Sequence, residues 1–230
     1  NGMGVAATLA VLEAKDIVHG PIEALFTASE EVGMDGAFGL KAGEVNGASL
    51  MKPDSETEGQ LYVGCAGGLD ANIRFDYTAD SAEYADHKPI KLEISGLRGG
   101  HSGMEIILQR ANANKLLCRF LRLSFKKYEL KLASIDGGGL RNAIPREAMA
   151  TVLVPSKDVS EVEADFGNFK ELIVREYEGR EDSISMKTSY GAAQSSVIPK
   201  AVALNLISAV YGCPIGVITM SISMPRLVQA

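Results

Sequence analysis

The pattern of hydrophobic and polar positions changes its character near residue 68. Before it, residues 4–16 carry Ala, Leu and Val at helical spacing, and short apolar runs follow at 21–29, 47–59 and 60–68. The helical spacing predicts a buried helix, and the short runs predict strands. A loop with one helical turn is expected at 34–44. A helix followed by strands indicates an α/β arrangement, which commonly places its functional site at strand ends.

From residue 69 onward, apolar and polar positions alternate as in half-exposed strands. Strands are predicted at 69–79, 88–97, 128–138, 147–155 and 183–192, and helices at 103–123, 158–179 and 199–212. The order strand, helix, strand, strand, helix, strand is that of a ferredoxin-like α+β sandwich. We therefore expect two domains, an α/β domain at 1–67 and an α+β domain at 68–230.

Composition narrows the function classes. The net charge is −6 without a long Lys/Arg block, which argues against a nucleic-acid partner. No apolar run reaches the roughly 20 residues that span a bilayer. Cys65, Cys118 and Cys213 are odd in number and far apart, which fits a reducing cytoplasm better than a disulfide framework. The first residues begin within a helix and the last lie in a predicted strand, so we expect an internal fragment whose second domain is incomplete at its C-terminal end.

Two adjacent glutamates, Glu30 and Glu31, follow the apolar run at 21–29. Neighbouring side chains point to opposite faces of a regular strand, but at a strand end the backbone turns and both can reach one cavity. Two such close like charges stay ionised only with a cation or a shared proton between them. A metal would satisfy this, with one carboxylate as ligand and the other accepting a proton from its water. The alternative is a solvated acidic loop.

A second acidic stretch, "KPDSETEG", places Asp54 at the end of the run at 47–59, followed by Ser55, Glu56 and Glu58. Carboxylates from two strand ends that meet at one sheet edge form an oxygen-rich metal site. The alternative is a polar turn in which Asp54 or Ser55 caps the backbone locally.

The stretch "GLRGGHSG" surrounds His101 with glycines. Glycine lets the backbone approach a ligand closely, and small neighbours leave the imidazole accessible. Ser102 can cap the helix that follows. The alternative is a tight turn whose histidine faces water. His19 and His87 lie in turn or charged-loop contexts and are interpreted as surface residues.

Three glycines precede Arg141 and Asn142 in "DGGGLRNAIPREA". Arg and Asn side chains can hold a carboxylate or a carbonyl oxygen, which makes both candidates for substrate binding. The alternative is a hairpin turn that requires glycine.

Together, the stretches "NGMGVAATLAVLE", "FTASEEVGMDGA", "DSETEG", "GCAGG", "GLRGGHSG" and "LRNAIPRE" resemble the aminoacyl-histidine dipeptidases. These are Xaa-His dipeptidases, or PepD-like carnosinases, with two catalytic zinc ions in a metallopeptidase catalytic domain and a lid domain that forms a homodimer. The resemblance implies a dipeptide substrate and a cytoplasmic location, with residues 1–67 as part of the catalytic domain and 68–230 as the lid.

The same resemblance implies a role for each matching residue. Glu30 corresponds to the general base, Glu31 to a ligand of one zinc and Asp54 to a ligand of the other. His101 corresponds to the lid histidine that reaches across the dimer to the developing oxyanion, and Asn142 to a lid residue near the substrate.

The family's other metal ligands, a His-x-Asp motif, a bridging Asp and a final His, have no counterpart in this sequence, so we expect the chain to be inactive alone. Other possibilities are a related aminoacylase, carboxypeptidase or tripeptidase, or a dimerisation or binding module without catalysis. The segment "RFLRLSFKKYELK" at 119–131 is expected to form a partly buried edge in the dimer contact.

Overall fold

The computed structural model describes residues 2–31, 33–55, 58–64, 67–82, 85–224 and 227–229. The chain divides into two compact units, Asn1–Gly68 and Leu69–Ala230. No helix among the described residues has both the length and the apolar character that a membrane crossing requires.

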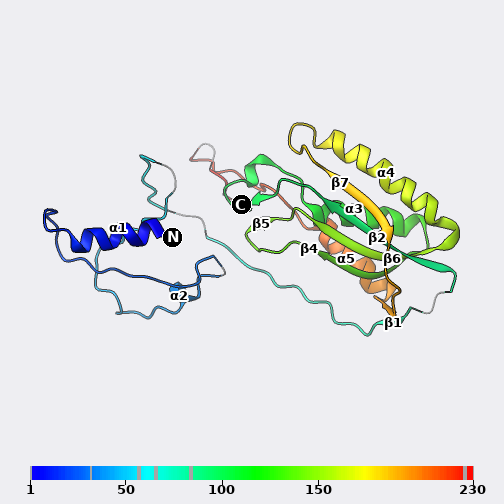
Figure 1. Ribbon diagram of the computed structural model, residues 1–230, viewed down its shortest axis with the longest axis horizontal. Helices are drawn as coiled ribbons and strands as arrows, with labels where there is room; N and C mark the ends of the chain where they lie inside the picture. The colour runs from blue at the N-terminus through cyan, green and yellow to red at the C-terminus, as the bar shows by residue number, and fades with distance from the viewer. Residues whose placement is uncertain are drawn as a thin grey trace. The chain divides into compact units, whose positions relative to one another are not determined.

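The described residues of the first unit form two helices, α1 (Gly2–Glu13) and the short α2 (Asp35–Phe38) (Figure 1). Both were predicted as helical. Ala and Leu, which dominate α1, are strong helix formers, so local preference is enough to explain this element. The expected burial of α1 is wrong, because none of its residues, all of which the structure describes, is buried.

The strands predicted at 21–29, 47–59 and 60–68 are wrong for the described residues of the first unit, which contain no strand. A strand exists only when its backbone groups pair with a neighbour, so an apolar run alone does not make one. Leu61 and Val63 illustrate this, with exposed fractions of 85% and 94%. Residues 56–57 and 65–66, which include Glu56 and Cys65, lie outside the described residues.

The second unit is built on a four-stranded antiparallel sheet with the order β4-β6-β2-β7. Its strands are β2 (His87–Ser95), β4 (Lys131–Gly137), β6 (Ala148–Pro155) and β7 (Ser185–Tyr190). This order, with a helix after the first strand and another after the third, confirms the ferredoxin-like prediction. The strand predicted at 69–79 is wrong, since only the two-residue β1 (Asp80–Ser81) forms nearby, paired with β8 (Ser196–Val197).

Three helices lie against this sheet: α3 (Ala113–Lys127), α4 (Val159–Glu176) and α5 (Lys200–Gly212) (Figure 1). The strand β2 buries every second side chain, Ile90, Leu92 and Ile94. These residues share one hydrophobic core with apolar side chains of all three helices. The rings of Phe120 and Phe166 meet edge to face with centroids 4.7 Å apart and join α3 to α4 within it.

The helix predicted at 103–123 begins about ten residues later than expected. Asn112 is its N-cap, and the Asn112 side chain accepts a hydrogen bond from the backbone N–H of Lys115 at 3.1 Å. The preceding residues form only the short 3₁₀ helix η1 (Ile106–Leu108).

The segment 119–131 is not the edge that was predicted. Its residues 119–127 form the second half of α3 and residue 131 begins β4, and Phe120, Leu121 and Phe125 are buried in the core of their own unit. These three side chains are therefore satisfied within one copy of the chain, whereas Leu123 of the same segment is 54% exposed. A dimer contact at this segment stays a prediction.

Candidate functional site

The stretches around His101 and Asn142 are held side by side by two short strands, β3 (Gly100–His101) and β5 (Ala143–Ile144). Gly100 pairs with Ile144 and His101 with Ala143. The pairing continues one residue further, where the backbone N–H of Ser102 donates to the carbonyl oxygen of Asn142 at 2.8 Å. Two motifs that are separate in the sequence therefore share one local structure. Two-residue strands are too short for a side-chain pattern to predict them.

The imidazole of His101 has a defined proton position. Its Nδ1 atom accepts hydrogen bonds from the backbone N–H groups of Gly103 at 3.0 Å and Met104 at 3.2 Å. A nitrogen that accepts cannot carry the proton, so the neutral ring carries its proton on Nε2. The residue is exposed, which leaves this N–H available as a hydrogen-bond donor to a ligand.

The backbone of His101 is fixed by a carboxylate of its own loop. The His101 N–H donates to Glu105 Oε2 at 2.8 Å, and Glu105 Oε1 lies 2.9 Å from Arg110 Nη2. The bond from the His101 backbone, followed by the charge of Arg110, lowers the pKa of Glu105. Arg110 also donates to the carbonyl oxygen of Gly99 at 2.5 Å. The loop therefore holds its histidine through a short ionic network.

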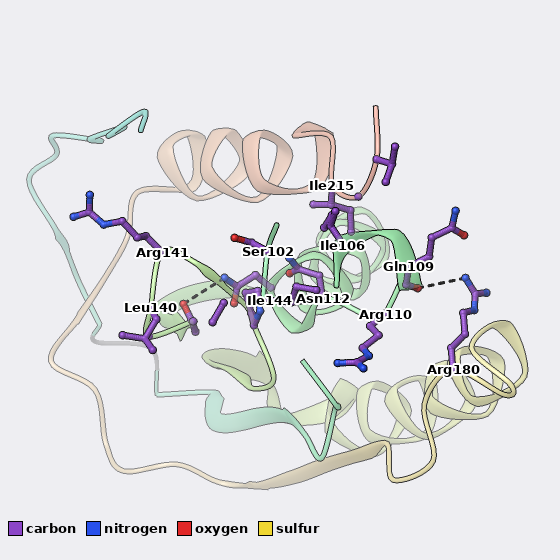
Figure 2. A pocket seen from close by; sticks show the side chains of 18 of the residues that line it. Ser102, Ile106, Gln109, Arg110, Asn112, Leu140, Arg141, Ile144, Arg180 and Ile215 are labelled. Atoms are coloured by element: carbon purple, nitrogen blue, oxygen red, sulfur yellow. Dashed lines mark hydrogen bonds between the residues drawn. The ribbon is translucent and has the colours of Figure 1, made fainter. Parts of the chain in front are cut away.

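A cavity of about 700 Å³ adjoins Ser102 in the second unit (Figure 2). It is lined by the residues before α3, the glycines at 137–139 and the residues at 215–217. Among the described residues, its lining includes Arg110, Arg141 and Arg180 and no carboxylate. Two of these guanidinium groups already have carboxylate partners outside the lining, since Arg110 pairs with Glu105 and Arg141 with Asp70. The lining by itself therefore does not define the charge of a ligand.

Arg141 and Asn142 occupy different surroundings from each other. Arg141 donates to Asp70 Oδ2 at 2.6 Å, and Figure 2 shows its side chain pointing away from Arg110 and Arg180. Asn142 is exposed, and its carbonyl oxygen is bound to Ser102. Of the two predicted substrate-binding residues, only Arg141 lines the cavity.

Glu30 and Glu31 lie exposed in a tight turn of the first unit. The turn is closed by the backbone N–H of Met34, which donates to the carbonyl oxygen of Ser29 at 2.8 Å. Ser29 has φ 62° and Met34 φ 58°, in the left-handed region that non-glycine residues rarely adopt. Behind the turn, a Cβ on Gly36 would lie 2.5 Å from the backbone nitrogen of Ala28, so only glycine fits there. The turn is therefore closely specified.

Asp54 is exposed and forms an ion pair with Lys52, whose Nζ lies 2.9 Å from its Oδ2. The hydrogen bond and the charge of Lys52 lower the pKa of Asp54, so this carboxylate is ionised at neutral pH with a counterion of its own. Among the described residues, no three His, Cys, Asp or Glu side chains gather as a metal site would require. The structure therefore does not bring the three predicted carboxylates together as a metal centre.

Sequence reasoning missed several residues of the site. Arg110, Arg180 and Asn112 line the cavity, and Glu105 holds the His101 loop. None of them stands in a local pattern that distinguishes it from an ordinary surface residue. Only the capping position of Asn112, followed by an apolar helical repeat, carried a usable signal.

Known proteins resemble both a central part of the chain and most of its length. Residues 92–181 match the peptidase dimerisation domain family. The chain is 44% identical over 188 residues to the cytosol non-specific dipeptidase of Escherichia coli (strain K12), an alignment that covers 81% of this chain and 38% of that protein. It also matches the crystal structure of the aminoacylhistidine dipeptidase from Vibrio alginolyticus, with a TM-score of 0.78 and 43% identity over 99% of this chain and 46% of that one. The chain thus spans less than half the length of these relatives.

Proposed function

Because residues 92–181 carry the peptidase dimerisation domain and the chain is homologous to part of two dipeptidases, we propose that the whole protein hydrolyses dipeptides, with Xaa-His as the preferred class. Residues 1–67 then belong to its catalytic domain and residues 68–230 to its lid. The observation that supports this most directly is the exposed imidazole of His101, which carries its proton on Nε2 and lies in a strand beside Asn142, the residue before β5.

His101 serves in this proposal as a donor to the transition state. When water adds to the carbonyl carbon of the peptide, the carbonyl oxygen gains negative charge. An N–H whose orientation is already set stabilises that charge without having to reorganise. The two backbone bonds to Nδ1 of His101 supply this orientation. Arg141 and Asn142 would bind the substrate's polar groups from the same part of the lid.

Glu30 serves as the general base. A carboxylate in an exposed turn can accept the proton of the attacking water. When the carbon–nitrogen bond breaks, it can return that proton to the leaving amine. The proton that Glu30 takes from water is thus the proton that the leaving amine receives, so the carboxylic acid and amine products form without another acid.

Zinc is proposed for the whole protein from the resemblance of the motifs. Glu31 and Asp54 offer oxygen atoms of the type that zinc binds. Two carboxylates are fewer than the four ligands of a tetrahedral zinc site, and the described residues do not gather a third. The described residues of this chain therefore do not fit a zinc site by themselves.

We also propose that the whole protein is a homodimer through the lid and that it acts in the cytoplasm. The match to the peptidase dimerisation domain supports the first proposal, and the name of the Escherichia coli relative supports the second.

The test is a substrate panel for the whole protein and its Glu30→Gln variant. We expect turnover of Xaa-His dipeptides above that of N-acyl amino acids and tripeptides, and a loss of about 10²–10⁴-fold in kcat on removal of the base. Glu13→Gln, an exposed glutamate at the end of α1, is the matched control and should retain full activity. Faster turnover of acylated amino acids or tripeptides would replace the dipeptidase assignment, and full activity of Glu30→Gln would remove Glu30 from catalysis.

A further inference from the structure

We propose that Glu181 is a positioning residue for His101. Its buried carboxylate closes the neck of the loop that carries the imidazole, where the neck means Arg98 and Ala111, the first and last residues of that loop. This rests on the proposed role of His101 in catalysis. Glu181 lies 80 positions further along the chain, just after α4, in a part of the sequence that offers no catalytic motif.

The carboxylate of Glu181 binds both ends of one loop. Its Oε2 accepts the backbone N–H of Arg98 at 2.8 Å, and its Oε1 accepts the backbone N–H of Ala111 at 2.9 Å. The loop at 98–111 between these two contacts contains His101, Glu105 and Arg110. One side chain therefore holds the start and the end of the loop at a fixed separation.

Burial makes this clamp specific. Glu181 is only 7% exposed, and a carboxylate is rarely buried unless its oxygens are satisfied. The two backbone N–H groups supply that satisfaction. If the loop moved away, the carboxylate would lose both donors while it is still shielded from water. The free-energy cost of this unsatisfied carboxylate favours the conformation in which both ends of the loop stay bound to Glu181.

Two neighbouring contacts strengthen the same neck. Gly96 has φ 76°, and a Cβ placed on it would lie 2.1 Å from the carbonyl oxygen of Ser183. The backbone before the loop therefore runs directly against the backbone that follows Glu181. Arg98 and Asp182 also form an ion pair.

Hydrogen bonds and an ion pair within the loop connect its neck to the backbone of His101. Arg110, adjacent to Ala111, reaches back to the carbonyl oxygen of Gly99 and to Glu105. Glu105 in turn accepts the backbone N–H of His101. A shift of Ala111 or Arg98 would therefore be passed to the backbone of His101, and with it to the direction of Nε2–H.

The decisive variant is Glu181→Gln, which keeps one acceptor oxygen and places an NH₂ group against a backbone N–H. The first readout is the loop itself in the 230-residue chain. We expect amide exchange of Gly103 and Met104 to rise about fivefold or more, as a net loss of one hydrogen bond would give. We also expect the ¹⁵N spectrum of His101 to change from one tautomer to a mixture. Glu178→Gln, an exposed glutamate three residues earlier, should change neither.

The second readout is the kinetics of the whole protein. Glu181→Gln should lower kcat about tenfold or more, within the about 10²–10³-fold that removal of one oxyanion donor costs, while KM changes little. In a His101→Ala background, Glu181→Gln should have no further effect on kcat, because a positioning residue acts only through the residue it positions.

The outcomes separate the two proposals. If His101→Ala lowers kcat but Glu181→Gln does not, or if the two losses simply add, the positioning proposal is wrong. If neither variant changes kcat, the proposed role of His101 is wrong, and the positioning proposal falls with it. Should Glu181→Gln fail to fold, Glu181→Asp takes its place: it keeps the charge but is one methylene too short to reach both N–H groups, and the same exchange, tautomer and double-variant tests apply.

Discussion

The backbone N–H of Ser102 donates a hydrogen bond to the carbonyl oxygen of Asn142 at 2.8 Å. This bond extends the pairing of β3 with β5 and places the residue after His101 beside the residue before Ala143. The second unit thus brings His101 of β3 and Asn142, the residue before β5, to neighbouring positions.

Removal of the His101 imidazole should affect the chemical step. In the whole protein we expect His101→Ala to lower kcat by about 10²–10³-fold, because an oxyanion donor acts on the transition state, and to leave metal content unchanged. Steady-state kinetics with metal analysis measures both. His19→Ala, at an exposed histidine of the first unit, is the control. Loss of metal together with activity would instead indicate a structural or ligand role.

Mixing variants tests whether His101 serves a second copy of the chain. Inactive His101→Ala subunits mixed with inactive Glu30→Gln subunits should regain part of the activity if His101 acts across a dimer, since one site then has both residues. Verified mixed dimers without any recovery would assign His101 to its own subunit or remove it from catalysis.

The 230-residue chain alone should not hydrolyse dipeptides, even with added zinc. The reason is that its described carboxylates do not gather into a metal site. A histidine-containing dipeptide and a sensitive amine assay would check this. Turnover that disappears in the Glu30→Gln variant would contradict the prediction, whereas turnover that survives in that variant would point to a contaminant.

The two described cysteines should differ sharply in reactivity. Burial raises the pKa of the Cys118 thiol to about 11, whereas Cys213 is exposed. At pH 8 in the folded chain, we expect iodoacetamide to label Cys213 and not Cys118, as seen by peptide mapping. In urea both should react. Equal labelling of the folded chain would mean that the core around α3 opens readily.

Removal of the α3 cap should destabilise the second unit. Asn112→Ala loses the bond to the Lys115 N–H and should lower the free energy of unfolding by about 0.5–2 kcal/mol. Urea titration measures this. Asn168→Ala, on the exposed side of α4, is the matched control and should be neutral or slightly stabilising, because alanine favours a helix interior. Equal effects at both positions would argue against the cap.

Acid should weaken the contact between α3 and α4. The hydrogen bond from Lys127, at 2.9 Å, lowers the pKa of Asp165, and Tyr128 donates to the same oxygen at 2.8 Å. A carboxylate whose pKa is lower in the folded chain than in the unfolded chain stabilises the fold. This stabilisation is complete at a pH above the pKa in the unfolded chain, about 3.9, and it is lost as the pH falls through the lower pKa of the folded chain. We therefore expect the stability gap between wild type and Asp165→Asn to shrink between pH 7 and pH 3. The exposed Glu171→Gln should show no such change, and a constant gap for Asp165→Asn would refute the assignment.

The sequence by itself determined the sheet and two helices of the second unit. The strands β2, β4, β6 and β7 and the helices α4 and α5 were all predicted within a few residues of their observed ends. Each of these elements has a side-chain period that one segment displays on its own, whichever segment it packs against. The candidate residues Glu30, His101 and Asn142 were likewise found from local motifs, and their roles stay predictions.

Tertiary structure alone decided how distant segments pair. Three strands predicted in the first unit have no ladder among the residues that the structure describes, because a strand needs a partner as well as an apolar run. The pairing of His101 with Ala143 and the clamp of Glu181 on Arg98 and Ala111 both depend on backbone groups far from their partners in the chain. Every residue carries the same backbone donor and acceptor, so a local pattern cannot say which distant group will bind them.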